Sequence, residues 1–255
     1  MKIKVLGWAG GIGGNLKTTS FLIDDDILVD AGTGLGDLAL NDMKSIRYVF
    51  LTHSHMDHIA GLPLLADNLF GVHDEPIVIH ALEETINALK AHIFNWVIWP
   101  DFSELPSKEN ATIRFEVMLP GDKVIIRSRV IEMITVNHIV PGVGYCVSTE
   151  DSVVAFSGDT TTNDSLWSAL NEYDKIDMLF VEAAFENQNI ELSKVSRHYC
   201  PQLLAEDLVK LKHRPDIWLT HFKPGKEDLI FKECLQALPD YNVRCLNGGE
   251  VFDLS

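Results

Sequence analysis

The sequence has few of the residues that build disulfide-stabilised or membrane-embedded proteins. It contains 4 cysteines among 255 residues, and none of them forms a C-x-x-C pair. We expect reduced core thiols, which excludes a small secreted scaffold held by disulfides; the cysteines are Cys146, Cys200, Cys234 and Cys245. The apolar runs are shorter than the roughly 20 residues of a membrane helix, and the first residues lack a signal-peptide pattern. A cytoplasmic protein that does not enter a membrane is therefore expected.

Basic residues are also scarce. The chain has 21 Lys plus Arg against 37 Asp plus Glu, which gives a formal net charge of −16. A surface that collects many phosphates needs the opposite sign, so tRNA and other large nucleic acids are not expected partners. Divalent metal ions in one cleft can still hold a small anion on an acidic protein. The charge balance therefore favours a small-molecule substrate.

Repeats, low-complexity tracts and Ser/Gly/Pro-rich linkers are absent, so a single domain over residues 1–255 is predicted. Strand patterns are found at 2–6, 20–23, 27–30, 47–52, 77–80, 112–117, 123–126, 130–136, 144–148, 153–157, 178–182, 217–221 and 243–246. Helical patterns are found at 83–92, 201–212 and 227–238. This alternation predicts an α/β protein in which two packed sheets carry helices on both outer faces.

Four metal-competent residues follow the apolar stretch Tyr48–Leu51 in the order H-x-H-x-D-H; they are His53, His55, Asp57 and His58. If Thr52 ends a strand, His53 and His55 point the same way because side chains alternate along a strand. The other two follow where the chain turns. Such an arrangement fits two ions close together better than one closed tetrahedral site. Ordinary polar loop residues are the alternative, but the narrow residue order favours a metal site.

Three further strand-like runs each end in one metal-competent residue, namely His138, Asp159 and His221. Taken alone, each fits an ordinary surface histidine or a turn aspartate. Enzymes with parallel sheets gather their sites at strand ends, however, so these residues complete a set of seven candidate ligands with the first cluster.

This set resembles the metallo-β-lactamase superfamily of hydrolases, in the branch without a cysteine ligand, over nearly the whole chain. The resemblance implies a four-layer αββα fold with two mixed sheets. It also implies two divalent ions: one held by His53, His55 and His138, the other by Asp57, His58 and His221, with Asp159 as the bridge. Nitrogen and carboxylate ligands favour Zn²⁺, with Mn²⁺ or Fe²⁺ as alternatives.

Outside this set, Glu182 and His198 resemble a pair used by the tRNase Z-like phosphodiesterases. In that family the histidine protonates the leaving oxygen and the glutamate orients it, which helps a poor alkoxide leaving group. The structural alternatives are a loop or N-cap carboxylate at Glu182 and a residue preceding the helix that Pro201 opens at His198. Only twenty positions lie between His138 and Asp159, which leaves no room for that family's tRNA-binding arm.

The segments 53–62 and 92–100 resemble the class II cyclic-nucleotide phosphodiesterases, with Met56 where that family usually has leucine. The resemblance implies hydrolysis of the 3′ ester bond of 3′,5′-cyclic AMP, or of cyclic GMP, to the 5′-nucleotide. A hydroxide bridging the two ions attacks phosphorus, and His198 is the general acid. Glu182 and Asp57 complete the implied catalytic set, and a homodimer is expected. A hydrolase of another small phosphodiester, a lactone or a thioester is the main alternative; a non-catalytic binding module is the other.

Two segments have open interpretations. An aromatic-rich insertion at about 92–110 contains Phe94, Trp96, Trp99 and Phe102; it suits a lid over a purine, a dimer contact or a hairpin packed on its own domain. The glycine-rich segment 10–19 fails the P-loop pattern because Leu16 stands where glycine is required. It is better interpreted as a tight hairpin that passes close to the metal cleft.

Overall fold

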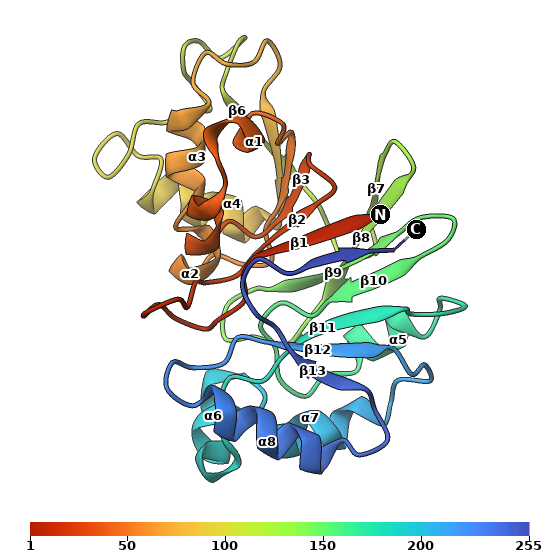
Figure 1. Cartoon of the computed structure of the whole chain (residues 1–255). Coiled ribbons are helices and arrows are strands. Elements are labelled where there is room, and N and C mark those ends of the chain that lie inside the picture. The colour runs from red at the N-terminus through yellow and green to blue at the C-terminus, as the bar shows by residue number, and fades with distance from the viewer. Residues whose placement is uncertain (255) are drawn as a thin grey trace.

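Two seven-stranded sheets pack face to face with helices on their outer sides in this computed structural model, which describes residues 1–254 (Figure 1). The strand orders are β14-β1-β2-β3-β4-β5-β6 and β13-β12-β11-β10-β9-β8-β7. Helices α1–α4 cover the first sheet and α5–α8 the second (Figure 1). The predicted αββα class with two mixed sheets is confirmed.

The first sheet comes mainly from the N-terminal half of the chain. Its strands are β1 (Lys2–Gly7), β2 (Ser20–Ile23), β3 (Ile27–Val29), β4 (Tyr48–Phe50), β5 (Ile77–Ala81), β6 (Ile113–Val117) and β14 (Val251–Asp253). Its helices are η1 (Thr33–Asp37), α1 (Leu40–Met43), α2 (Met56–Ile59), α3 (Leu62–Asn68) and α4 (Glu83–His92). Strands β3 to β6 run parallel, and β14, β1, β2 and β3 pair antiparallel.

The second sheet holds the remaining strands in a similar arrangement. They are β7 (Lys123–Ile126), β8 (Arg129–Thr135), β9 (Val143–Ser148), β10 (Val153–Phe156), β11 (Met178–Glu182), β12 (Asp216–Thr220) and β13 (Val243–Cys245). The helices are α5 (Ser165–Leu170), η2 (Asn187–Asn189), α6 (Ile190–Ser196), α7 (Pro201–Leu208) and α8 (Glu227–Ala237). Because β10 to β13 run parallel, their carboxyl ends lie at one edge of the sheet.

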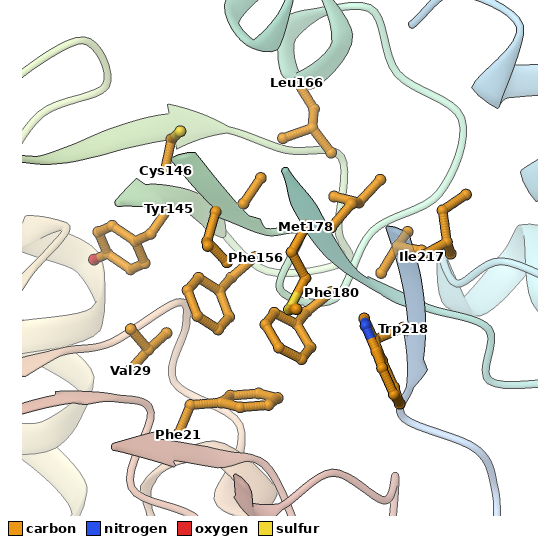
Figure 2. Close-up of a cluster of buried hydrophobic side chains, with 14 of the residues drawn as sticks. Phe21, Val29, Tyr145, Cys146, Phe156, Leu166, Met178, Phe180, Ile217 and Trp218 are labelled. Carbon is orange, nitrogen blue, oxygen red and sulfur yellow. The ribbon is translucent and has the colours of Figure 1, made fainter. Parts of the chain in front are cut away.

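Aromatic side chains from both sheets meet in the core between them. Phe21 from β2 lies 5.2 Å from Phe156 and 5.0 Å from Phe180, measured between ring centroids, and the latter two rings stack (Figure 2). Such aromatic pairs contribute about 0.5–1.5 kcal/mol each beyond the area they bury. The contacts hold the two sheets in a fixed relation near the edge where the candidate ligands emerge.

The expected element bounds were wrong in several places. Strand β4 ends at Phe50 instead of Thr52, because the backbone N–H of Thr52 donates to the carboxylate of Asp30 instead of continuing the ladder. Helix α7 ends at Leu208, four residues earlier than predicted. The sequence patterns also missed β14 and the short helices α1, α2, α3, α5 and α6.

The aromatic-rich segment after α4 divides into buried and exposed parts. Phe94 and Phe102 are buried in the core under the first sheet's helices, and Trp99 packs partly against that core. Trp96, by contrast, is 59% exposed at the tip of the segment. Within residues 1–254, none of the helices is both long enough and apolar enough to cross a membrane.

Candidate metal centre

The structure brings all seven candidate ligands together in two groups that share Asp159. One group contains His53, His55, His138 and Asp159, and the other Asp57, His58, Asp159 and His221. Within each group the candidate ligand atoms lie within 4.8 Å of one another. The division is the one that the family resemblance implied. His55 and Asp57 are partly exposed while the other ligands are buried, so the site opens to solvent on their side.

Five of the ligands stand in loops just after a strand, whereas Asp57 and His58, expected where the chain turns, lie in helix α2. His53 and His55 lie between β4 and α2, with His55 in extended backbone directly before the helix. His138, Asp159 and His221 follow β8, β10 and β12. Because both sheets end here, residues far apart in the sequence come together at one site.

Backbone geometry fixes two of these positions. Gly158, which precedes Asp159, has φ +59°, and a Cβ there would lie 2.6 Å from the carbonyl oxygen of Val143; only glycine meets both conditions. His221 itself has φ +64°, which is uncommon for a non-glycine residue. Its N–H donates to the carbonyl of Trp8 at 2.6 Å, so the first loop of the chain holds this strained ligand in place.

At this site, three buried histidine nitrogens have no hydrogen-bond partner among the described residues: Nε2 of His53, Nε2 of His58 and Nδ1 of His221. They lie 3.6, 3.3 and 3.1 Å from the carboxylate oxygens of Asp159. A buried polar atom without a partner costs about 1–3 kcal/mol. Histidine nitrogens grouped around the carboxylate of Asp159 are the kind of ligand set that binds divalent cations. The residues present therefore fit a metal centre.

His138 has a similar preference for a cation. Its Nδ1 donates to the carbonyl of Arg197 at 3.1 Å, which leaves the lone pair on Nε2. That nitrogen lies 3.2 Å from Nδ1 of His55 and 4.0 Å from Asp159. Hydrogen-bonding the far nitrogen of a ligand histidine to a carbonyl is the usual way in which proteins fix its ring and tautomer.

Burial and charge shift the pKa values of the ligands in different directions. Burial holds the pKa values of His53 and His221 well below the ordinary value. Burial alone would raise the pKa of Asp159, but the neighbouring His221 and His58 hold it well below its usual range. Burial also opposes charge on His58, but Asp159 and Asp30 outweigh it and raise its pKa well above the ordinary value. A cation between these carboxylates is therefore favoured.

Asp30 is a supporting residue that the sequence patterns missed. It is fully buried directly after β3, and its Oδ2 lies 2.7 Å from Nδ1 of His58. The same carboxylate accepts hydrogen bonds from the N–H and hydroxyl of Thr52. This contact orients the ring of His58 with Nε2 towards Asp159, the usual arrangement around a metal-bound histidine. The available signal was a lone aspartate after a buried strand, in V-D-A-G.

Glu182 and His198 lie together beside the two ligand groups. Oε1 of Glu182 accepts hydrogen bonds from Nδ1 of His198 at 2.8 Å and from the N–H of Thr160 at 3.0 Å. The ring centroid of His198 is 4.9 Å from that of His138 and 5.0 Å from that of His221. Burial works against charge on this imidazole, but Glu182 raises its pKa above the ordinary value. Glu182 ends β11 and caps no helix.

Comparisons with known proteins agree with this architecture. A probable 3′,5′-cyclic-nucleotide phosphodiesterase of Yersinia pestis is 26% identical over 83% of this chain and 72% of its own length. A ribonuclease Z of Lachnoclostridium phytofermentans is 28% identical over 84% of each chain. The crystal structure of unliganded yeast PDE1 shares the fold, with a TM-score of 0.81 at 18% identity over 98% of both chains. The beta-lactamase superfamily domain matches residues 25–222, a span that contains all the candidate ligands, and the chain therefore belongs to this superfamily.

Proposed function

We propose that this protein is a metal-dependent phosphodiesterase that hydrolyses the 3′ ester bond of 3′,5′-cyclic AMP, with cyclic GMP as a second substrate, to the 5′-nucleotide. The observation that carries the proposal is the hydrogen-bonded pair of Glu182 and His198. The ring centroid of His198 lies 4.9 Å from that of His138 in one ligand group and 5.0 Å from that of His221 in the other. The similarity to a probable cyclic-nucleotide phosphodiesterase supports the substrate class.

The two ligand groups would hold two divalent ions, with Zn²⁺ expected and Mn²⁺ or Fe²⁺ as alternatives. His53, His55 and His138 serve one ion, Asp57, His58 and His221 serve the other, and Asp159 serves both. When bound, such ions supply Lewis-acid stabilisation of phosphoryl charge and a water of lowered pKa. The partly exposed Asp57 and His55 leave this centre open to a small phosphodiester.

His198 supplies the proton that the leaving 3′ oxygen needs. Glu182 holds Nδ1, so Nε2 is the nitrogen that is left to face a substrate. A ribose alkoxide leaves poorly without protonation, and a positioned general acid contributes about 10²- to 10⁴-fold in rate. Glu182 accepts the hydrogen bond from Nδ1 and sets the ring orientation.

A tRNA substrate, as the ribonuclease Z similarity would suggest, fits this chain less well. Strands β9 and β10 and the turn that joins them occupy residues 143–156 of the short segment between His138 and Asp159, which leaves no room for a protruding arm. The net charge of −16 also opposes the binding of a polyanion. Thioester hydrolysis needs an acid such as His198 less, because a thiolate leaves more easily than an alkoxide. The expected homodimer stays a prediction.

Product analysis tests the proposal. Protein loaded with Zn²⁺ or Mn²⁺ is incubated with 3′,5′-cyclic AMP, beside His198→Ala, Asp159→Ala and the control His92→Ala, which removes an exposed histidine at the end of α4. We expect 5′-AMP from the wild type and the control and almost none from the other two. No product from fully metallated wild-type protein would overturn the proposal.

A further inference from the structure

A lysine ammonium lies at the edge of the metal centre. Lys223 stands two residues after His221, in the turn between β12 and α8, and is partly buried. Its Nζ donates to the carbonyl of Gly10 at 3.1 Å and lies 3.4 Å from Nε2 of His221. It also lies 6.0 Å from the ring centroid of Phe185, and that ring is 5.8 Å from the ring of His198. The ammonium therefore lies beside both a candidate ligand and the proposed acid.

No carboxylate of the described residues comes within ion-pair distance of Lys223, although acidic residues far outnumber basic ones. The contrast with Lys226, three residues further along the same turn, is informative. That lysine is more exposed and pairs with Glu186 at 3.3 Å. A partly buried charge without a counter-charge is costly, so the position of Lys223 favours an anion from outside the chain.

The contact with His221 does not satisfy the ammonium once the histidine holds a cation. A neutral imidazole has one nitrogen with a lone pair and one that carries a proton. When the lone pair is given to a cation, neither nitrogen can accept a hydrogen bond from Lys223. The ammonium then keeps only the carbonyl of Gly10, and two of its three protons remain for another acceptor.

The backbone around Lys223 holds this arrangement. Gly10 N donates to the carbonyl of Phe222 at 3.0 Å, and His221 N donates to the carbonyl of Trp8. A Cβ on Gly10 would lie 2.5 Å from the carbonyl oxygen of His221, so only glycine allows the loop to approach this closely. The acceptor that anchors the lysine is therefore fixed relative to the metal centre.

We propose that Lys223 forms an anion subsite that binds a non-bridging phosphoryl oxygen of the substrate and the phosphate of the product. The ligand class is a phosphate monoester or diester that lies across the metal centre. The identity of the nucleotide rests on the proposed function, but the binding of a phosphoryl anion by Lys223 does not.

The experiment compares Lys223→Met, Lys223→Arg and the matched control Lys226→Met, all loaded with Zn²⁺ and with metal content measured. Binding of inorganic phosphate and of 5′-AMP is followed by calorimetry, and KM and kcat are measured with 3′,5′-cyclic AMP. Loss of one charge-assisted hydrogen bond weakens binding roughly 10- to 100-fold. We expect that loss, with a matching rise in KM, for Lys223→Met; the arginine variant and the control should bind within a few-fold of the wild type.

Two results separate this inference from the proposed function. Phosphate affinity equal to wild type in Lys223→Met would overturn the subsite, whatever the activity. Binding of phosphate that depends on Lys223, in a protein that leaves cyclic AMP intact, would keep the subsite and remove the proposed function. If Lys223→Met loses metal, Lys223→Gln decides between these outcomes, because its amide can still donate to Gly10 while the charge is gone.

Discussion

Nδ1 of His198 donates a hydrogen bond to Oε1 of Glu182 at 2.8 Å, and within residues 1–254 this is the only side chain that donates to the Glu182 carboxylate. Backbone N–H groups of Thr160, Ala184 and Tyr199 make the other three. These donors come from the loop after β10, from the loop after β11 and from the residue next to His198. The ring is therefore oriented by main chain that also positions Asp159, and proton donor and metal centre are built as one unit.

Replacing His198 by alanine tests whether this ring acts as an acid. We expect hydrolysis of 3′,5′-cyclic AMP to fall by about 10²- to 10⁴-fold. Hydrolysis of bis(4-nitrophenyl) phosphate should fall far less, because 4-nitrophenolate leaves without a proton. Steady-state rates of both substrates with the same metal-loaded variant provide the comparison. Equal losses on both substrates would assign His198 a role in metal binding or substrate positioning instead.

Replacing Asp30 by asparagine tests the support of His58. The carboxylate of Asp30 uses both oxygens as acceptors for Nδ1 of His58 and the donors of Thr52, and an amide has only one such oxygen. The loss of an orienting partner of this kind typically lowers metal affinity about 10- to 100-fold. Competition with a chromophoric chelator measures the affinity. Asp37→Asn is the matched control, since Asp37 is half exposed and pairs with Lys17 at the surface. Unchanged affinity in Asp30→Asn would contradict the role.

The local part of the site could be predicted from sequence, and the supporting part could not. His53 to His58 stand in one short run, and His138, Asp159 and His221 each end a strongly apolar strand, so pattern and spacing indicate them. The contacts of Asp30 and Lys223 depend on loops that come together only in the folded chain. Contacts made only in the folded chain also explain the missed helices. Helix α2, for example, has four residues, and so short a helix is stabilised by tertiary packing and not by the helix propensity of its sequence.

Removal of metal should destabilise the fold. Without a cation, the three unpartnered nitrogens around Asp159 stay buried and unsatisfied. Binding to the folded state alone stabilises a protein by about 4 kcal/mol when free metal exceeds its Kd 1,000-fold. We expect Tm to fall clearly on treatment with a chelator and to recover on adding Zn²⁺, as measured by scanning calorimetry. Asp159→Ala should show neither change; a chelator effect of wild-type size in this variant would locate the stabilising metal elsewhere.

Cys146 and Cys245 should react slowly with alkylating reagents in the native protein. Burial raises the pKa of Cys146 to about 12 and that of Cys245 to about 11, so both thiols stay protonated at pH 8. Unfolded cysteines ionise near pH 8.5. A raised folded pKa stabilises the fold fully below about pH 8.5, and this contribution is lost as pH rises towards the folded values. Iodoacetamide labelling at pH 8, with and without urea, checks this; rapid native labelling of Cys146 would contradict it.

Replacing Gly10 by alanine tests whether the first loop sets the position of His221. The added methyl would lie 2.5 Å from the His221 carbonyl oxygen and 2.8 Å from its ring carbon Cδ2, and relieving such an overlap typically costs about 1–3 kcal/mol. Because the ring has to move, metal affinity should fall together with Tm. Gly36→Ala is the control, since a methyl at that position meets nothing within 4 Å. A lower Tm with unchanged metal affinity would contradict this prediction. It would mean that the loop around Gly10 shifts while the ring of His221 stays in position, so that the Gly10 carbonyl that holds Lys223 moves instead.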